Sequence, residues 1–362
     1  MTDADLRAGP VSAARSGVRR HAMVALRLCV TLGLLWFMAT KIDITQAGGL
    51  ISHAPAALLL AAVAALLATT PINAVRWRAF LAPGPPLPTT ATLLKVLLVG
   101  IFFNQVLPSG IGGDAVRAWR CRILGIRLGV AVRSILLERA SGYSVFVALY
   151  AVGLPRLLQA IPDSRQRHAL LLVLVVCVAG LAALLVLDKL PGVISRIPLM
   201  AWLAELAVAG RRFCADPWRL TANLVLSASS VGLTVFGFKL AGDAVGVHLA
   251  YSTWLVVVPP IALIQLVPIS LAGWGVREVV LVTLLGAFGI PPANALAASL
   301  LFGLCQIAIA LPGGLVWLGG WDVAPTAADV EPAVDLIGDG ASTPPALSPR
   351  PEPADRSRQA AG

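Results

Sequence analysis

Long runs of apolar residues, bounded by charged or helix-breaking residues, recur along most of the chain. A helix needs about 20 apolar residues to cross the hydrocarbon core of a bilayer. Six runs approach or exceed that length, at about 22–40, 54–72, 129–154, 169–187, 220–241 and 293–319. Two more, at about 90–107 and 250–290, are apolar but interrupted by proline and glycine. The pattern predicts an all-α polytopic membrane protein with about six to eight transmembrane helices.

The composition supports this fold class, because 58% of the residues are hydrophobic, 13% are charged and the mean hydropathy is +0.84. A soluble fold could not hide so much apolar surface. Residues 22–321 are therefore predicted to form the membrane domain. From residue 322 the chain is rich in Pro, Ala and acidic residues and has no aromatic residue after Trp321. Residues 322–362 are predicted to be a disordered tail.

The net charge of +10 does not indicate a nucleic-acid-binding protein, because the basic residues are dispersed between the apolar runs. The positive-inside rule accounts for them instead. It places the basic arm 1–21 in the cytoplasm, together with Arg76, Arg78 and the basic linker that follows 169–187. A cleaved signal peptide is the alternative for residues 1–40, but no small-residue cleavage pattern follows the first apolar run.

The first interrupted stretch is predicted to be a re-entrant hairpin rather than a full crossing. A full crossing of 90–107 would place four arginines outside, against the positive-inside rule: Arg117, Arg120, Arg122 and Arg127. The hairpin tip, 104–114, combines polar amides with one proline and three glycines, which break a helix. Such backbone is tolerated at membrane depth where protein buries it or where it lines a watery cavity. Asp114 is predicted to cap a short helix over 115–124.

The second interrupted stretch repeats the first at a constant offset of 160 residues, since 268 − 108 and 277 − 117 both equal 160. The identical pairs at that offset are Gln105 and Gln265, Pro108 and Pro268, Gly113 and Gly273, Val116 and Val276, and Arg117 and Arg277. Three full crossings separate the two copies, so the hairpins are predicted to enter from opposite sides, as an inverted repeat with halves of about 54–154 and 220–319. Many secondary transporters have this architecture, in which one half rocks against the other. The alternative is two unrelated kinks in long helices.

Charged residues inside apolar runs are functional candidates. Glu138 and Arg139 lie in such a run, and adjacent residues on a helix point about 100° apart, so each is expected to need a different partner. Arg277 and Glu278 repeat this pattern directly after the second break, and Arg117 follows the first. A guanidinium can bind two phosphate oxygens at once, which suits a lipid headgroup. The alternative is that these charges pair with one another and lock the bundle.

The sequence carries no enzyme or metal signature. It has no nucleophile elbow, no phosphate-binding glycine loop followed by lysine and no metal-binding histidine pair. Its five cysteines and four histidines are scattered without paired spacing. We therefore expect no catalytic activity, no cofactor and no metal, and transport that runs down a gradient or is coupled to ions rather than to ATP.

The charged and helix-breaking residues also form an ordered set of motifs. These are Asn104 through Arg117, then Ser134, Glu138 and Arg139, then Pro268, Gly273, Gly275, Val276, Arg277 and Glu278, then Gly313-Gly314 followed by Trp317. Over roughly 22–319 the chain resembles the flippase-like transmembrane domain of the lysylphosphatidylglycerol synthase family, which also occurs as stand-alone bacterial membrane proteins. The resemblance implies a plasma-membrane bundle with re-entrant helices and, from the bifunctional members, translocation of aminoacylated phosphatidylglycerol. Those members carry a soluble aminoacyl-transferase domain after the membrane part, so this chain is not expected to make such a lipid itself.

The sequence leads to one functional hypothesis and two alternatives. The hypothesis is a lipid flippase or transporter that holds an anionic phospholipid or glycolipid headgroup between the hairpins. The first alternative is a lipid-binding scaffold subunit for a separate synthase or glycosyltransferase. The second is an intramembrane lipid-modifying enzyme, for which the sequence offers no recognisable nucleophile or metal site. The residues expected to line the headgroup cavity are Asn104, Gln105, Asp114, Arg117, Glu138, Arg139, Gln265, Arg277 and Glu278. The residues expected to break the hairpins are Pro108, Gly110, Gly112, Gly113, Pro268, Gly273 and Gly275.

Overall fold

The computed structural model describes residues 42–81, 87–107, 112–186, 198–266 and 273–319, together with residues 29, 32, 33, 36 and 40. Within these residues the regular structure is helical and contains no strand. The helices are α2 (Ile44–Ser52), α3 (Ala56–Phe80), α4 (Thr90–Val106), α5 (Gly112–Ile123), α6 (Leu128–Ala160), α7 (Ser164–Val186), α8 (Pro198–Cys214), α9 (Pro217–Asp243), α10 (Tyr251–Ile264), α11 (Val276–Gly286) and α12 (Pro292–Leu318).

Several predicted features lie outside the described residues. They are the arm 1–21, the tail 322–362, most of the first apolar run, and the hairpin residues Pro108, Gly110 and Pro268.

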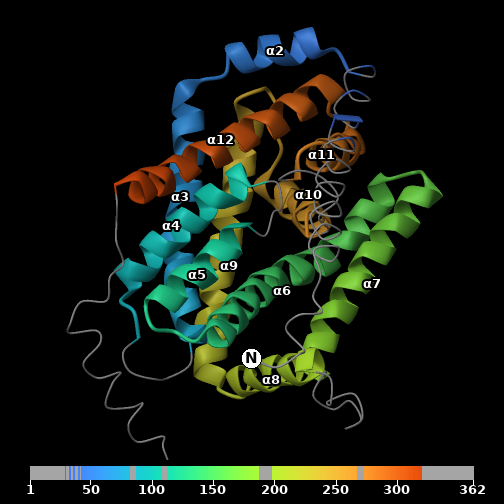
Figure 1. The fold of residues 1–362 in the computed structure, drawn as a ribbon. Helices are drawn as coiled ribbons and strands as arrows, with labels where there is room; N and C mark the ends of the chain where they lie inside the picture. The colour runs from blue at the N-terminus through green and yellow to red at the C-terminus, as the bar shows by residue number, and fades with distance from the viewer. Residues whose placement is uncertain are drawn as a thin grey trace, which may run out of the picture.

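Among the described residues, five helices are long and apolar enough to cross a membrane, namely α3, α6, α7, α9 and α12. They coincide with five of the six predicted spans, and α4 and α10 are shorter apolar helices at the two interrupted stretches. The all-α, multi-pass membrane class is therefore confirmed. The helices form one bundle, with α8 at one end and α2 at the other (Figure 1).

The arrangement of α3–α6 recurs in α9–α12. α4 packs on α3, α5 and α12, and α10 correspondingly packs on α9, α11 and α6. In the same way α6 packs on α9 and α12 packs on α3, while α3 and α9 lie side by side in the middle of the bundle. The interval along the chain from the start of α3 (Ala56) to the start of α9 (Pro217) equals the interval from the start of α4 (Thr90) to the start of α10 (Tyr251). The helix order and its contacts thus repeat between the two halves.

Glycines allow helices to cross closely at matching places in the two halves. A Cβ on Gly313 of α12 would lie 2.0 Å from the carbonyl oxygen of Leu98 on α4. A Cβ on Gly153 of α6 would lie 3.1 Å from the Cγ2 atom of Val256 on α10. Gly153 and Gly313 are related by the offset found at the hairpins, which therefore extends to these crossings.

In the first hairpin, α4 and α5 approach each other through glycine and are joined by a side-chain cap. The Oδ1 atom of Asn104 accepts a hydrogen bond of 2.9 Å from the backbone N–H of Gly113. A Cβ on Gly113 would lie 2.0 Å from the carbonyl oxygen of Gly100. α5 begins at Gly112, so the predicted cap at Asp114 is wrong. Asp114 lies in the first turn instead, because Asn104 from the preceding helix already satisfies an N-terminal N–H group.

The second hairpin uses two glycines in the left-handed region. Gly273 has a φ of +81° and Gly275 a φ of +87°, conformations that a residue with a Cβ rarely adopts. The carboxylate of Glu278 accepts a hydrogen bond of 2.6 Å from the N–H of Gly275, which closes the first turn of α11. A Cβ on Gly273 would also lie 2.6 Å from the Oε1 atom of Gln265 at the end of α10.

The predicted basic linker between the spans at α7 and α9 contains a helix that the apolar pattern did not reveal. α8 packs on α6, α7 and α9, and it buries Leu206 and Ala207. Its last turn carries Arg211 and Arg212. An apolar face with basic residues at one end is typical of a helix that lies along a membrane surface.

The close crossing of α4 and α12 leads to a stability prediction. We expect Gly313→Ala to lower the free energy of unfolding by about 1–3 kcal/mol, because the added methyl group collides with backbone rather than with a flexible side chain. Gly180→Ala in α7 is the matched control, since a Cβ there meets nothing within 4 Å. The measurement is the thermal unfolding midpoint of the purified protein in detergent. Equal midpoints for the two variants would contradict the packing described for α4 and α12.

Candidate functional site

A network of charged side chains lies where α3, α5 and α6 meet. It contains three arginines and two carboxylates: Arg76, Arg117, Arg139, Asp114 and Glu138. Charges at this depth in a membrane protein are expensive unless they are paired. The network carries a formal net charge of +1.

Glu138 joins two of the arginines. Its Oε1 atom lies 3.1 Å from Nη2 of Arg76, and its Oε2 atom lies 3.5 Å from Nη2 of Arg117. Arg76 also donates to the backbone carbonyl of Glu138 at 2.7 Å and to Oδ1 of Asn73 at 2.9 Å. The side chains of Arg76, Glu138 and Arg117 are only 4%, 9% and 7% exposed. Glu138 therefore holds α3, α5 and α6 together through buried ion pairs.

Asp114 joins the remaining arginine to the network. Its Oδ1 atom lies 3.3 Å from Nη1 of Arg117, and its Oδ2 atom lies 2.6 Å from Nε of Arg139. Glu138 and Arg139, although adjacent, thus have different partners, in agreement with their divergent directions on the helix. The Arg139 side chain is 30% exposed and is the most accessible of the network.

Part of the donor capacity of the arginines is not used by the protein. Among the described residues, no acceptor forms a hydrogen bond with the buried Nε groups of Arg76 and Arg117. The guanidinium of Arg117 also lies 4.1 Å from the centre of the Trp77 ring. Buried donors without a protein acceptor are uncommon in folded proteins. Together with the formal net charge of +1, these donors make the region electrostatically suited to an anion.

The network borders a cavity of about 310 Å³ between the two halves. The polar or charged residues in its wall are Asn73, Arg76, Glu138, Arg139, Tyr143, Ser230, Thr234, Gln265 and Gln306. They come from α3 and α6 on one side and from α9, α10 and α12 on the other. The cavity thus lies at the contact between the halves, and its charged wall belongs to the first half.

The sequence profile of the lysylphosphatidylglycerol synthase transmembrane region matches residues 24–314. The chain belongs to this family. No curated protein and no solved structure matches the chain. The match includes all five residues of the charged network and the cavity wall.

In this member of the lysylphosphatidylglycerol synthase transmembrane-region family, the second half contains a closed ion pair. Nη2 of Arg277 lies 2.6 Å from Oε1 of Glu278, and the two side chains are 1% and 0% exposed. Ser299 donates to the same carboxylate oxygen at 3.0 Å, and Nη1 of Arg277 donates to Oε1 of Gln306 at 3.4 Å. Here, unlike Glu138 and Arg139, the adjacent residues do pair, in the first turn of α11. Among the described residues, Gln306 connects Arg277 to the cavity wall.

The structure divides the headgroup-site residues predicted from the sequence into three groups. Glu138, Arg139 and Gln265 lie in the cavity wall. Asp114, Arg117 and Arg277 contact residues of that wall. Asn104 caps α5, Gln105 is half-buried at the end of α4, and Glu278 is buried beside Arg277, so none of these three borders the cavity.

Sequence reasoning missed several residues of the site. Arg76 was considered only for the side of the membrane on which it lies, whereas its side chain is 3% exposed and belongs to the network. Asn73, Ser230, Thr234 and Gln306 were not singled out. The sequence did contain a signal for them, namely two polar residues one helical turn apart on the inner face of a span, as Asn73 and Arg76 are.

The position of Glu138 leads to a prediction about stability. We expect Glu138→Ala to lower the free energy of unfolding by about 3–5 kcal/mol, because it leaves two buried arginines without their common partner. Glu205→Ala is the control, since Glu205 is 62% exposed and its pair with Arg133 contributes about 0–1 kcal/mol. Thermal unfolding in detergent measures both. A Glu138 variant as stable as the Glu205 variant would show that the network does not hold the helices.

Proposed function

We propose that the protein moves lipids with an anionic headgroup, phospholipid or glycolipid, between the leaflets of the bacterial plasma membrane. The observation that carries the proposal is the cavity between the halves, bordered by a network of net charge +1 with unused guanidinium donors. The family to which the protein belongs is named after a phospholipid synthase, and this name supports a lipid as the ligand.

The chemistry of the cavity suits a phosphate-containing headgroup. A volume of about 310 Å³ lies at the lower end of ligand pockets, enough for a headgroup but not for two acyl chains. Arg139 is the arginine best placed to bind phosphate oxygens, because it is partly exposed and anchored by only one carboxylate. Tyr143, Thr234 and Gln265 add neutral donors for a sugar or glycerol hydroxyl. The acyl chains would remain in the bilayer.

The repeated arrangement of the halves supports alternating access. In the proposed topology the α8 end is cytoplasmic, because Arg78, Arg122, Arg127 and Arg212 gather there. The hairpin of α4 and α5 then enters from the cytoplasm and that of α10 and α11 from outside, as an inverted repeat. Rocking of one half against the other would open the central cavity to each leaflet in turn. Transfer of this kind forms and breaks no covalent bond, so the proposed function requires no catalytic step.

Arg139 allows the proposal to be tested on the cavity itself. In proteoliposomes that contain fluorescent phosphatidylglycerol, we expect Arg139→Gln to lower the initial rate of leaflet exchange at least tenfold, because the headgroup loses its charged partner. Arg139→Lys should keep part of the rate. Arg156→Gln is the matched control, since Arg156 bonds to Thr253 and lies outside the cavity wall.

The outcomes separate the two functional hypotheses. A rate for Arg139→Gln equal to that of the control would exclude this cavity as the path. No exchange by the unaltered protein, together with co-purification of a synthase or glycosyltransferase, would instead favour the scaffold.

The proposed topology leads to a labelling prediction. Single cysteines at Leu87 and Arg127, which flank the first hairpin, should react with a membrane-impermeant thiol reagent from the cytoplasmic side only. Single cysteines at His248 and Gly286, which flank the second, should react from the outer side only. All four would be introduced after replacement of the five natural cysteines. Reaction of Leu87→Cys and Arg127→Cys from opposite sides would mean that α4 and α5 cross the membrane and would remove the inverted repeat.

A further inference from the structure

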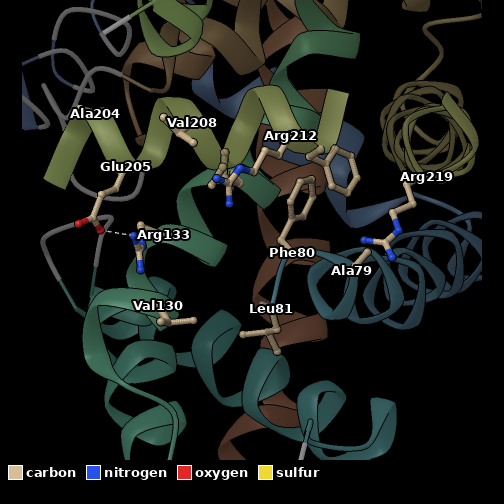
Figure 2. A pocket seen from close by; sticks show the side chains of 13 residues that line it. Ala79, Phe80, Leu81, Val130, Arg133, Ala204, Glu205, Val208, Arg212 and Arg219 are labelled. Atoms are coloured by element: carbon tan, nitrogen blue, oxygen red, sulfur yellow. Dashed lines mark hydrogen bonds and ion pairs between the residues drawn. The ribbon is translucent and has the colours of Figure 1, made fainter. Parts of the chain in front are cut away.

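A second and larger cavity lies beneath α8, at the end of the bundle opposite α2. Its volume is about 820 Å³. The ends of α3 and α6 form its floor, and α8 and the start of α9 form its roof and side (Figure 2). We call it the α8 cavity. Most of its wall is apolar, including Phe80, Leu81, Val130 and Val208.

Three arginines and one glutamate line the α8 cavity: Arg133, Arg212, Arg219 and Glu205. Glu205 pairs with Arg133, and Arg219 pairs with Asp216 at 3.1 Å. In the part of the chain that the structure describes, Arg212 has no acidic partner. The cavity therefore combines an apolar wall with an excess of positive charge, which is the combination that an anionic lipid requires.

A polar seam between α6 and α9 joins the α8 cavity to the central cavity. On α9, Arg219 borders the first cavity and Ser230 the second, and Asn223 and Ser227 lie between them on the same helical face. The stretch from 219 to 230 spans about 16 Å along the helix. On α6, Leu137 borders the α8 cavity, and Ser141 follows one turn later, beside the central cavity.

The seam is closed in this structure. Ser141 donates a hydrogen bond to Oδ1 of Asn223, and its Oγ atom lies 3.2 Å from Oγ of Ser227. Asn223 is 3% exposed, and its Nδ2 group has no acceptor among the described residues. A buried amide donor without an acceptor is costly inside a membrane protein. The seam thus contains a hydrogen-bond donor, the Nδ2 group of Asn223, that the bonds within the seam do not use.

Packing alone does not require these polar residues. The equivalent seam of the other half is the contact between α12 and α3. At the offset that relates the two hairpins, the counterparts of Ser141, Asn223 and Ser227 are Leu301, Val63 and Leu67. The positions that form the polar seam are therefore apolar in the other copy of the repeat.

We propose that the α8 cavity is a loading site for one anionic lipid and that the seam of Ser141, Asn223 and Ser227 is the gate through which its headgroup passes to the central cavity. The phosphate binds at Arg212 and Arg219, and the acyl chains lie along the apolar wall. Parting of α6 from α9 exposes the polar side chains of the seam to the moving headgroup. The inference rests on the proposed function, and it adds the leaflet of loading, which is the one on the α8 side.

A reversible cross-link tests the gate. In a cysteine-free background, Ser141→Cys combined with Ser227→Cys places two sulfur atoms where oxygen atoms lie 3.2 Å apart, a separation that favours a disulfide. A photoreactive amino acid at Phe146 reports lipid in the central cavity, and one at Val208 reports lipid in the α8 cavity. The probe is a phosphatidylglycerol vesicle, and leaflet exchange is measured in parallel.

We expect the oxidised protein to retain cross-linking at Val208, to lose at least nine-tenths of the cross-linking at Phe146, and to exchange lipid at least tenfold more slowly. Reduction should restore both, and the single-cysteine variants should be insensitive to oxidant. Arg212→Gln with Arg219→Gln should lower cross-linking at Val208 at least fivefold, whereas the exposed Arg122→Gln should not.

The outcomes distinguish the gate from the proposed function. Unchanged cross-linking at Phe146 in the oxidised protein would overturn the gate, and absence of cross-linking at Val208 in either state would overturn the loading site. If the unaltered protein does not exchange lipid, the proposed transport fails. Redox-dependent cross-linking at Phe146 would still support a gated path from the α8 cavity to the central cavity.

Discussion

The buried carboxylate of Glu138 is the interaction on which the rest of the site depends. It lies between Arg76 of α3 and Arg117 of α5, and it is itself carried by α6. Three helices therefore meet at one negative charge, in a region where an unpaired arginine would be expensive. Asp114 extends the network to Arg139, which borders the central cavity. The requirement to pair buried charges thus fixes both the packing of the first half and the electrostatics of its cavity.

The two halves have the same helix arrangement but use their arginines differently. Arg117 belongs to a network with one more positive than negative charge, whereas Arg277, its counterpart in the second half, is paired with Glu278 and is closed from the cavity. The polar seam is likewise present between α6 and α9, and the residues at the corresponding positions of the other copy are apolar. The two halves therefore share a helix arrangement, but the network with a net positive charge belongs to the first half.

The local signals in the sequence identified the framework correctly. Hydropathy identified five observed spans, since about 20 apolar residues in succession have few alternatives to crossing a bilayer. Proline and glycine marked the ends of α4 and α10, because their effects on the backbone are local. Four charged residues of the network were singled out because a charge within or beside an apolar run is a local signal, whereas Arg76 was missed and Asp114 was wrongly predicted to cap α5. In both cases a partner on another helix decides the role of the residue.

The sequence by itself determined that the chain is a helical membrane protein, that its halves share a motif, and that arginine and carboxylate residues lie within apolar segments. Only the tertiary structure decided which charges pair, because Arg76 and Glu138 are far apart in the chain and meet through the contact of α3 with α6. It also decided where the cavities lie, since each is bordered by helices from distant parts of the chain. Hydrophobic burial along one helix is recorded in its own residues, whereas ion pairs and cavities depend on the angles at which several helices cross.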